Sequence, residues 1–280
     1  MRMGLTWSRG QAAAAGLVVG LLACCPAAAR AQLAAPGPSG VVMGHLHLTT
    51  SDMEASRRFW TALGGVPVQN GTLQLIQLPG TFVMLRQAPQ KPAGSEGATV
   101  ERVVLRIRSS EVAQVFEKLA QATGSKVTSG LFPSPEGVMV EIRGALEDAP
   151  PVRLERLFFR TIAPAETRDW YVKTFGATPG SQAQGQPDGS RGEVLTATLP
   201  GVIMYFNKAD AAPAGTRGRA LDHVGFEVRN LEEFCKKLEA AGQKFDRPFT
   251  RLPNSTVAIA FFTDPWGTYI ELTENLAPQK

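Results

Sequence analysis

Histidines and a glutamate in short segments of alternating polar and apolar residues are the side chains of this sequence whose types could support chemistry. His45 and His47 are separated by a leucine, so in a β-strand both imidazoles face one side and the neighbouring leucines the other. His223 lies in a second alternating segment, and Glu271 shares one face of a third with Tyr269. Imidazole nitrogens and carboxylate oxygens are common ligands of divalent metals. The chemistry therefore depends on whether the fold brings these segments together.

Cysteine offers little additional chemistry. Cys24 and Cys25 lie in an N-terminal segment that we expect to be removed, which leaves Cys235 and excludes an intrachain disulfide. Cys235 lies in an apolar stripe of helical period over residues 231–241. We therefore expect a buried, inert thiol rather than a nucleophile.

Residues 1–31 have the pattern of a cleavable signal peptide. A positively charged start precedes the small and apolar run Ala12–Ala23, and Ala29–Ala31 has the A-x-A form that precedes a cleavage site, with Gln32 as the first mature residue. An alternative is lipidation of Cys24, which would anchor the chain to a membrane. Either reading predicts an exported protein that is periplasmic or secreted.

The charge of the chain gives no indication of a nucleic-acid partner. The formal charge is +4, but Arg2, Arg9 and Arg30 lie in the N-terminal segment, which has no acidic residue. The mature chain is therefore close to neutral, and it has no basic run or basic helix face that could follow phosphates.

An internal repeat organises the chain after a flexible leader at residues 32–43. Two pairs of segments carry the repeat: Leu78–Met84 with Leu199–Tyr205, and Pro135–Ile142 with Pro265–Leu272. The repeat divides the chain into two homologous halves, residues 44–148 and residues 152–276.

Each half divides again into two units, each a strand, an amphipathic helix and two or three further strands. The first unit is predicted as strand 45–49, helix 53–63 and strands 73–78 and 81–86, and the fourth as strand 223–228, helix 231–241 and strands 257–263 and 268–273. The second unit covers residues 100–143 and the third residues 154–207. Residues 181–192 and 208–219, rich in Gly, Pro and polar residues, are expected to be loops.

These units resemble the modules of the vicinal oxygen chelate superfamily, which includes glyoxalases, bleomycin-resistance proteins and extradiol dioxygenases. Gly44–Asp52 and Asp222–Val228 are similar to the first strand of such a module, and Thr263–Leu272 is similar to the last strand. The resemblance implies an α+β fold in which four βαβββ modules form two curved mixed sheets with helices outside.

The resemblance also implies two metal-ligand positions per module, one on the first strand and one on the last. The first-strand positions are His45, Arg102, Arg156 (or its neighbour Glu155) and His223. The last-strand positions each lie four residues after a turn glycine, and they are Met84, Glu141, Tyr205 and Glu271.

The module pairing decides which of these residues share a cleft. Pairing within each half would give each cleft one histidine, one carboxylate and a fixed positive charge, which opposes metal binding. Crossed pairing would place His45, His223 and Glu271 in one cleft and the arginines in the other. We prefer the crossed arrangement because two histidines and one carboxylate suit Fe(II) or Mn(II), with Zn(II) or Ni(II) as alternatives.

Four further residues receive roles from their positions. His47 is expected to line the cleft beside the ligands, and His47 and Tyr269 are the candidate catalytic groups for proton transfer. Alternatively, Tyr269 is an aromatic residue of the strand without a catalytic role. Met84 is expected in the cleft wall, and Glu141 in an ion pair with an arginine of the other cleft.

These expectations indicate an exported, metal-dependent enzyme that acts on a small, oxygen-rich substrate bound through neighbouring oxygens. A ring-cleaving dioxygenase fits the ligand triad. A glyoxalase fits less well, because Met84 removes a fourth ligand and glutathione belongs mainly to the cytoplasm, and a thiol transferase meets the same objection about export. The alternative is a non-catalytic protein that sequesters a small molecule in a decayed metal site. With four modules in one chain, a monomer could build both clefts.

Overall fold

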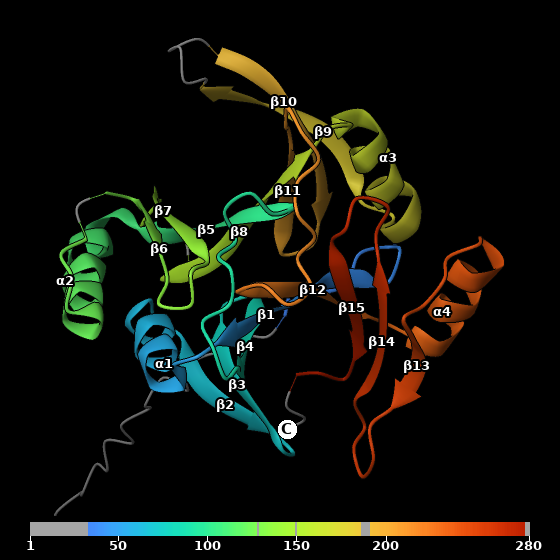
Figure 1. Cartoon of the computed structure of the whole chain (residues 1–280), viewed down its shortest axis with the longest axis horizontal. Helices are drawn as coiled ribbons and strands as arrows, with labels where there is room; N and C mark the ends of the chain where they lie inside the picture. The colour runs from blue at the N-terminus through green and yellow to red at the C-terminus, as the bar shows by residue number, and fades with distance from the viewer. Residues whose placement is uncertain (1–32, 128, 149, 186–190, 278–280) are drawn as a thin grey trace, which may run out of the picture. The chain divides into compact units, whose positions relative to one another are not determined.

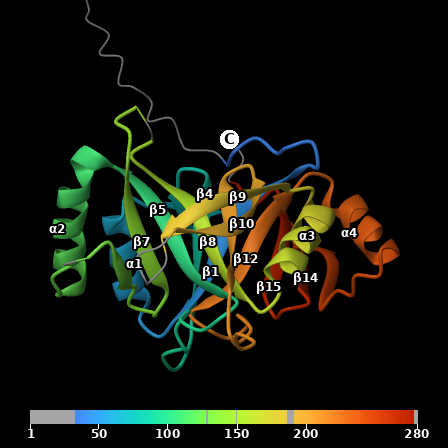
Figure 2. The same cartoon turned by 90° about the horizontal axis from the view of Figure 1, so that it is seen from above.

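The computed structural model describes residues 33–127, 129–148, 150–185 and 191–277, which form two mixed β-sheets with helices on their outer sides (Figure 1 and Figure 2). The predicted α+β architecture of two mixed sheets is thereby confirmed. The predicted signal peptide at residues 1–31 lies outside the described residues, and so does Cys24.

The first sheet has eight strands among the described residues, in the order β13-β14-β15-β12-β1-β4-β3-β2. The elements of its first half are β1 (Val41–Thr50), α1 (Met53–Ala62), β2 (Val66–Asn70), β3 (Leu73–Leu78) and β4 (Thr81–Gln87). The elements of its second half are β12 (Leu221–Val228), α4 (Leu231–Ala240), β13 (Arg247–Arg251), β14 (Ala258–Thr263) and β15 (Tyr269–Glu274).

The second sheet has seven strands in the described part of the chain, in the order β6-β7-β5-β8-β11-β10-β9. Its first half comprises β5 (Val100–Arg108), the short 3-10 helix η1 (Ser109–Glu111), α2 (Val112–Thr123), β6 (Leu131–Pro133) and β7 (Met139–Ala145). Its second half comprises β8 (Val152–Thr161), α3 (Pro164–Phe175), β9 (Thr178–Gly185), β10 (Arg191–Leu199) and β11 (Val202–Lys208).

Each sheet combines one module from each half of the sequence. In the first sheet, β1 and β12 pair antiparallel at the centre, and His47 lies opposite His223. In the second sheet, β5 and β8 pair antiparallel in the same way. The modules are therefore paired as one with four and two with three. Residues 44–148 and residues 152–276 each contribute strands to both sheets.

Some predicted element boundaries need correction. The chain already pairs at Val41, opposite Val228, so the first strand begins inside the segment expected as a leader (residues 32–43). Residues 181–185 and 191–192, expected in a loop, belong to the antiparallel pair β9 and β10. The edge strands β2 and β13 were not predicted either. Edge strands are half exposed, so they do not need the apolar alternation that reveals a central strand.

The second module departs from the expected βαβββ pattern. Its described residues form a βαββ unit, in which α2 is followed by β6 and β7. The segment 124–130 separates α2 from β6. The other three modules have the full βαβββ order.

Two buried carboxylates connect the two sheets. Glu136, in the turn before β7, accepts hydrogen bonds from Ser56 Oγ and Trp60 Nε1 of α1, both at 2.8 Å. Asp264, in the corresponding turn before β15, accepts one from Tyr171 Oη of α3 at 2.9 Å. Each turn thus reaches the helix of a module in the other sheet, so modules adjacent in sequence remain in contact.

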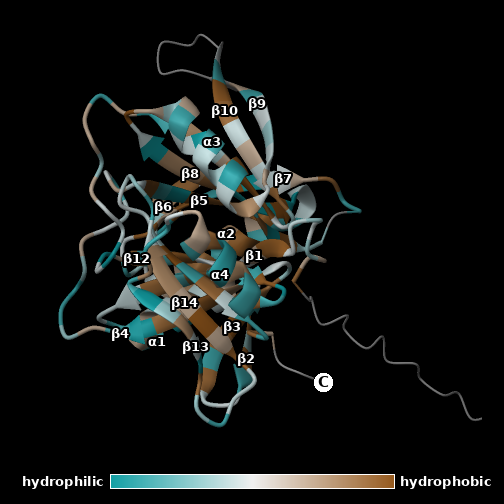
Figure 3. Cartoon of the chain, turned by 90° about the vertical axis from the view of Figure 1, so that its right-hand side faces the viewer, coloured by the Kyte–Doolittle hydropathy of each residue, from teal (hydrophilic) through white to brown (hydrophobic). Residues whose placement is uncertain are grey.

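The core lies where the helices pack against the sheets. Figure 3 shows hydrophobic residues (brown) along the strands and a mixture of brown and teal on α3 and α4. Trp60 is fully buried and Trp170 packs against the same core, as expected for helix residues. Cys235 is also buried, and burial raises the pKa of its thiol to about 12, so it stays protonated at neutral pH. None of the helices in the described residues is long and apolar enough to cross a membrane.

Candidate metal centre

The centre of the first sheet carries the histidines on its polar face. Leu46 and Leu48 are fully buried in the hydrophobic core on the opposite face of β1, which directs His45 and His47 away from α1. Because β12 runs antiparallel beside β1, it brings His223 next to them from the fourth module. β15 runs parallel to β12 and adds Glu271 from its own polar face.

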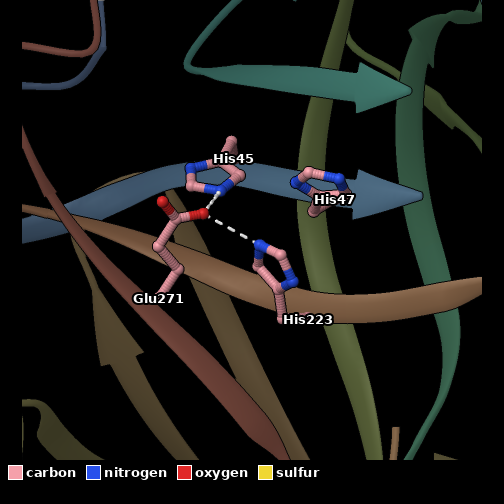
Figure 4. A group of neighbouring side chains, drawn as sticks. All are labelled: His45, His47, His223 and Glu271. Atoms are coloured by element: carbon pink, nitrogen blue, oxygen red, sulfur yellow. Dashed lines mark hydrogen bonds and ion pairs between the residues drawn. The ribbon is translucent and has the colours of Figure 1, made fainter. Parts of the chain in front are cut away.

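Glu271 holds two of the three imidazoles. Its Oε2 accepts a hydrogen bond from His45 Nε2 at 2.9 Å and another from His223 Nε2 at 2.8 Å (Figure 4). His45 is fully buried, and His223 and Glu271 are 4% and 5% exposed, so little water competes for these bonds. The three residues predicted as metal ligands thus converge from modules one and four.

A residue that sequence reasoning did not single out orients His223. Asp222 Oδ1 accepts a hydrogen bond from His223 Nδ1 at 2.7 Å. Its other oxygen accepts hydrogen bonds from the backbone N–H of Gly218 at 2.7 Å and from Arg86 Nη2 at 3.0 Å. A carboxylate on the far nitrogen of a histidine fixes the ring and the tautomer of a metal ligand. In the sequence, the indication of this role was that Asp222 directly precedes His223.

The charges of the cluster favour an ionised carboxylate beside a protonated imidazole. Burial raises the pKa of Glu271, but attraction to His45 and hydrogen bonds from His223 and His45 outweigh it, so the pKa lies well below its ordinary value. Burial lowers the pKa of His223, but the hydrogen bonds to Asp222 and Glu271 outweigh it and raise that pKa. Protonation of His223, which the raised pKa favours, would place positive charge where a bound cation would otherwise place it.

His47 belongs to the same cluster but has a different environment. Its ring centre lies 4.3 Å from that of His223 and 6.5 Å from that of His45. Burial, followed by repulsion from His223 and His45, lowers the pKa of His47 to about 3, so it is neutral at physiological pH. Neither of its buried ring nitrogens has a hydrogen-bond partner among the described residues.

The side chains present fit a divalent metal ion. Each of His45, His47, His223 and Glu271 offers one ligand atom, and these atoms all lie within 4.8 Å of one another. Nitrogen and oxygen ligands of this mixture suit Fe(II), Mn(II), Ni(II) or Zn(II). Unsatisfied buried nitrogens are rare in proteins unless something binds them, and His47 has two. No other group of this kind occurs in the described ranges.

Tyr269 and Met84 lie beside the cluster. The Tyr269 ring is 5.5 Å from the His223 ring, stacks on Phe261 and lies under the Arg217 guanidinium. Met84 pairs with His47 across β1 and β4. His47, Met84 and Arg86 line a cavity of about 710 Å³, so the cluster borders a space that can hold a small molecule.

The second sheet uses the equivalent positions for ion pairs. Arg102 Nη1 lies 3.2 Å from Glu141 Oε2, as the sequence indicated, and Arg143 contacts the other oxygen of Glu141. Arg156 Nε lies 2.8 Å from Glu155, and its guanidinium lies over the Tyr205 ring. Guanidinium groups thus neutralise the carboxylates of this sheet.

Comparison with known proteins agrees with this architecture. Residues 153–272, which include the third and fourth modules, match the model of the Glyoxalase/Bleomycin resistance protein/Dioxygenase superfamily. None of the curated proteins matches the sequence. Glyoxalase I from Zea mays is similar in structure, with a TM-score of 0.65 and 17% identity over 84% of this chain and 92% of that chain. A candidate dioxygenase from Bacillus subtilis has a TM-score of 0.57 and 16% identity over 85% of this chain and 86% of that chain.

At these identities the solved structures demonstrate the shared fold, and the family match comes from the sequence of the second half. Residues 153–272 include His223 and Glu271. Residues 153–272 thus match the glyoxalase, bleomycin resistance protein and dioxygenase superfamily, the vicinal oxygen chelate proteins, and both sheets of the chain share the fold of the similar solved structures.

Proposed function

We propose that this protein is a metal-dependent enzyme that acts on a small, oxygen-rich substrate, with His45, His223 and Glu271 as ligands of a divalent metal. The observation that carries the proposal is the convergence of these three residues from opposite ends of the sequence. Their donor atoms lie 2.8 and 2.9 Å apart in a site that is almost fully buried. Fe(II) or Mn(II) suits two histidines and one carboxylate, and Zn(II) or Ni(II) are the alternatives.

A divalent ion at this site would act as a Lewis acid toward two neighbouring oxygens of the substrate. Asp222 holds the ring of His223 in place and keeps Nε2 directed at the site. Tyr269, whose ring centre lies 5.5 Å from that of His223, would be the candidate group for proton transfer, although burial raises the pKa of its hydroxyl. The cavity beside His47 would receive the remainder of the substrate, and Leu75 and Met84 make part of its wall apolar.

A dioxygenase-like reaction suits the site better than a glyoxalase-like one. By the internal repeat, Met84 occupies in the first module the position that Glu271 occupies in the fourth. A thioether is a poor ligand for a hard divalent ion, so the site has one carboxylate instead of two. Two histidines and one carboxylate with open positions form the ligand set of non-heme iron oxygenases.

The decisive experiment measures metal in protein purified without chelator. We expect one divalent ion per chain in the wild type, and Glu271→Gln should lower the affinity by at least about 100-fold, because it removes the anionic ligand. Glu141→Gln is the matched control: it changes the equivalent residue of the second sheet, which pairs with Arg102, and should keep the metal. A wild type without stoichiometric metal, whose small-molecule binding survives Glu271→Gln, would instead indicate a sequestering protein.

The reaction class can be tested on the same preparation. Protein reconstituted with Fe(II) should consume dioxygen in the presence of catechols if the reaction is dioxygenase-like, and Glu271→Gln should abolish the uptake. A metal-loaded protein that leaves dioxygen unchanged but isomerises a hemithioacetal would have a glyoxalase-like reaction.

We also propose that the protein is exported. The support is the sequence of residues 1–31, with its basic start, apolar run and Ala29–Ala31 motif. Intact mass measurement of protein from its native host should give a chain that begins at Gln32. A diacylglyceryl group on Cys24 would instead show a lipid-anchored protein, and an unprocessed Met1 would contradict export by this route.

A further inference from the structure

One of the ligand positions that the internal repeat defines in the first sheet holds a residue that is a poor metal ligand. The last-strand position of the fourth module holds Glu271, and the same position of the first module holds Met84. In the parallel pairing of β1 and β4, His47 lies directly opposite Met84, and in the antiparallel pairing of β1 and β12 it lies opposite His223. His47 therefore lies between Met84, which is not a ligand, and His223, which belongs to the cluster.

The environment of His47 differs from that of a structural histidine. A buried imidazole that serves the fold normally has a hydrogen-bond partner for each ring nitrogen. His45 and His223 each donate to Glu271, and His45 Nδ1 alone among their four ring nitrogens is buried without a partner, whereas both nitrogens of His47 are buried without a partner in the described part of the chain. One of these nitrogens lies within 4.8 Å of the donor atoms of the other three residues.

We propose that His47 is a fourth protein ligand of the metal and provides the ligand that Met84 does not provide. This inference rests on the proposed function, which supplies the metal itself. Nitrogen and oxygen ligands on opposite sides of one first-row ion lie about 4.0–4.4 Å apart. The separation of at most 4.8 Å in this cluster therefore requires a shift of only about half an ångström to close around an ion.

The position of His47 fits a ligand role. One of its nitrogens lies among the ligand atoms of the other three residues, and its ring centre lies 4.3 Å from that of His223, on the side where the cavity opens. Three histidines and one carboxylate would leave a six-coordinate ion two positions, enough for two substrate oxygens.

The test uses Co(II), whose visible spectrum reports its coordination. Calorimetric titration of metal-free protein should show that His47→Ala binds Co(II) at least about 10-fold more weakly than the wild type. Its Co(II) spectrum should also change, and added imidazole should restore it. His47→Gln, which keeps a polar side chain, should weaken binding in the same direction, and circular dichroism should show both variants folded.

A second substitution tests whether a ligand on β4, at position 84, can replace His47 on β1. Met84→Glu in the His47→Ala background should recover Co(II) affinity, because it places a ligand at that position. Met84→Leu alone is the control and should leave the affinity unchanged, because the thioether is not a ligand.

The outcomes separate this inference from the proposed function. Equal Co(II) affinity and equal spectra for wild type and His47→Ala would overturn the fourth-ligand assignment. If Glu271→Gln still lost the metal in that case, the proposed function would stand. A wild type that binds no Co(II) would overturn both.

Discussion

Gly225 of β12 lies directly against the His45 ring, and its substitution by alanine tests the geometry of the whole cluster. A Cβ atom at this position would lie 2.0 Å from His45 Cε1, 2.1 Å from Nδ1 and 2.5 Å from Nε2. Ordinary contact begins at 3.4 Å, so the ring has to move away. Metal–ligand bonds tolerate only about 0.2 Å of variation, so His45 could no longer bind together with Glu271.

We expect two effects of Gly225→Ala. Metal affinity should fall by more than the roughly 10- to 100-fold that loss of a hydrogen bond to a ligand usually causes. The metal-free protein should lose about 1–3 kcal/mol through overpacking, which lowers Tm by roughly 2–12 °C for a domain of this size. Titration calorimetry with Co(II) or Mn(II) measures the first effect, and thermal unfolding in the presence of a chelator measures the second.

Gly180→Ala is a matched control for this substitution. Gly180 is also a strand glycine, in β9 of the second sheet, and its Cβ would approach Thr196 Oγ1 at 3.0 Å, a milder contact. It should bind metal as the wild type does. If Gly225→Ala also kept wild-type affinity, the inferred place of the His45 ring against β12 would be refuted.

Two further predictions concern the carboxylate behind His223 and the pH dependence. Asp222→Asn should weaken metal binding by about 10- to 100-fold while the chain stays folded, because the His223 ring loses a charged acceptor but keeps its place; unchanged affinity would contradict an orienting role. In metal-free protein, His47 has a pKa of about 3 when folded and an ordinary value of 6.5, so the unfolded chain takes up the additional proton between these values. Stability should therefore fall as the pH falls through this window, and His47→Leu should gain Tm relative to the wild type from about pH 7 to about pH 5. A Tm difference that stays constant over this range would show that His47 is not buried as a neutral group.

The pattern of apolar and polar residues along each segment was enough to predict most helices and strands, and the face of its strand on which each site residue lies. The alternation around His45 predicted which side chains of that strand leave the core, and the buried Leu46 confirms it. The glycine of each repeated turn identified Met84 and Glu271 as equivalent positions. Such inferences succeed because side-chain direction in a strand follows from a period of two residues, which is a property of the chain itself.

The strands that could not be predicted from the sequence are those without a clear alternation of apolar and polar residues. β2 and β13 lie at the two edges of the first sheet, where one side of the strand faces solvent. β9 is similarly polar and rich in glycine, and it forms an edge of the second sheet. Pairing with a neighbouring strand, which the sequence does not display, makes these segments regular.

Only the tertiary structure decided which modules share a sheet. The first strands of the four modules have the same pattern, so any two of them could pair, and the ligand chemistry favoured the crossed arrangement without establishing it. The observed pairing joins β1 to β12, strands at opposite ends of the described chain. That contact makes His223 a neighbour of His47, places Gly225 under His45 and brings Asp222 behind the site. Periodicity describes how one segment faces its surroundings, whereas a binding site is defined by distances between segments, and those are set by the packing of the whole chain.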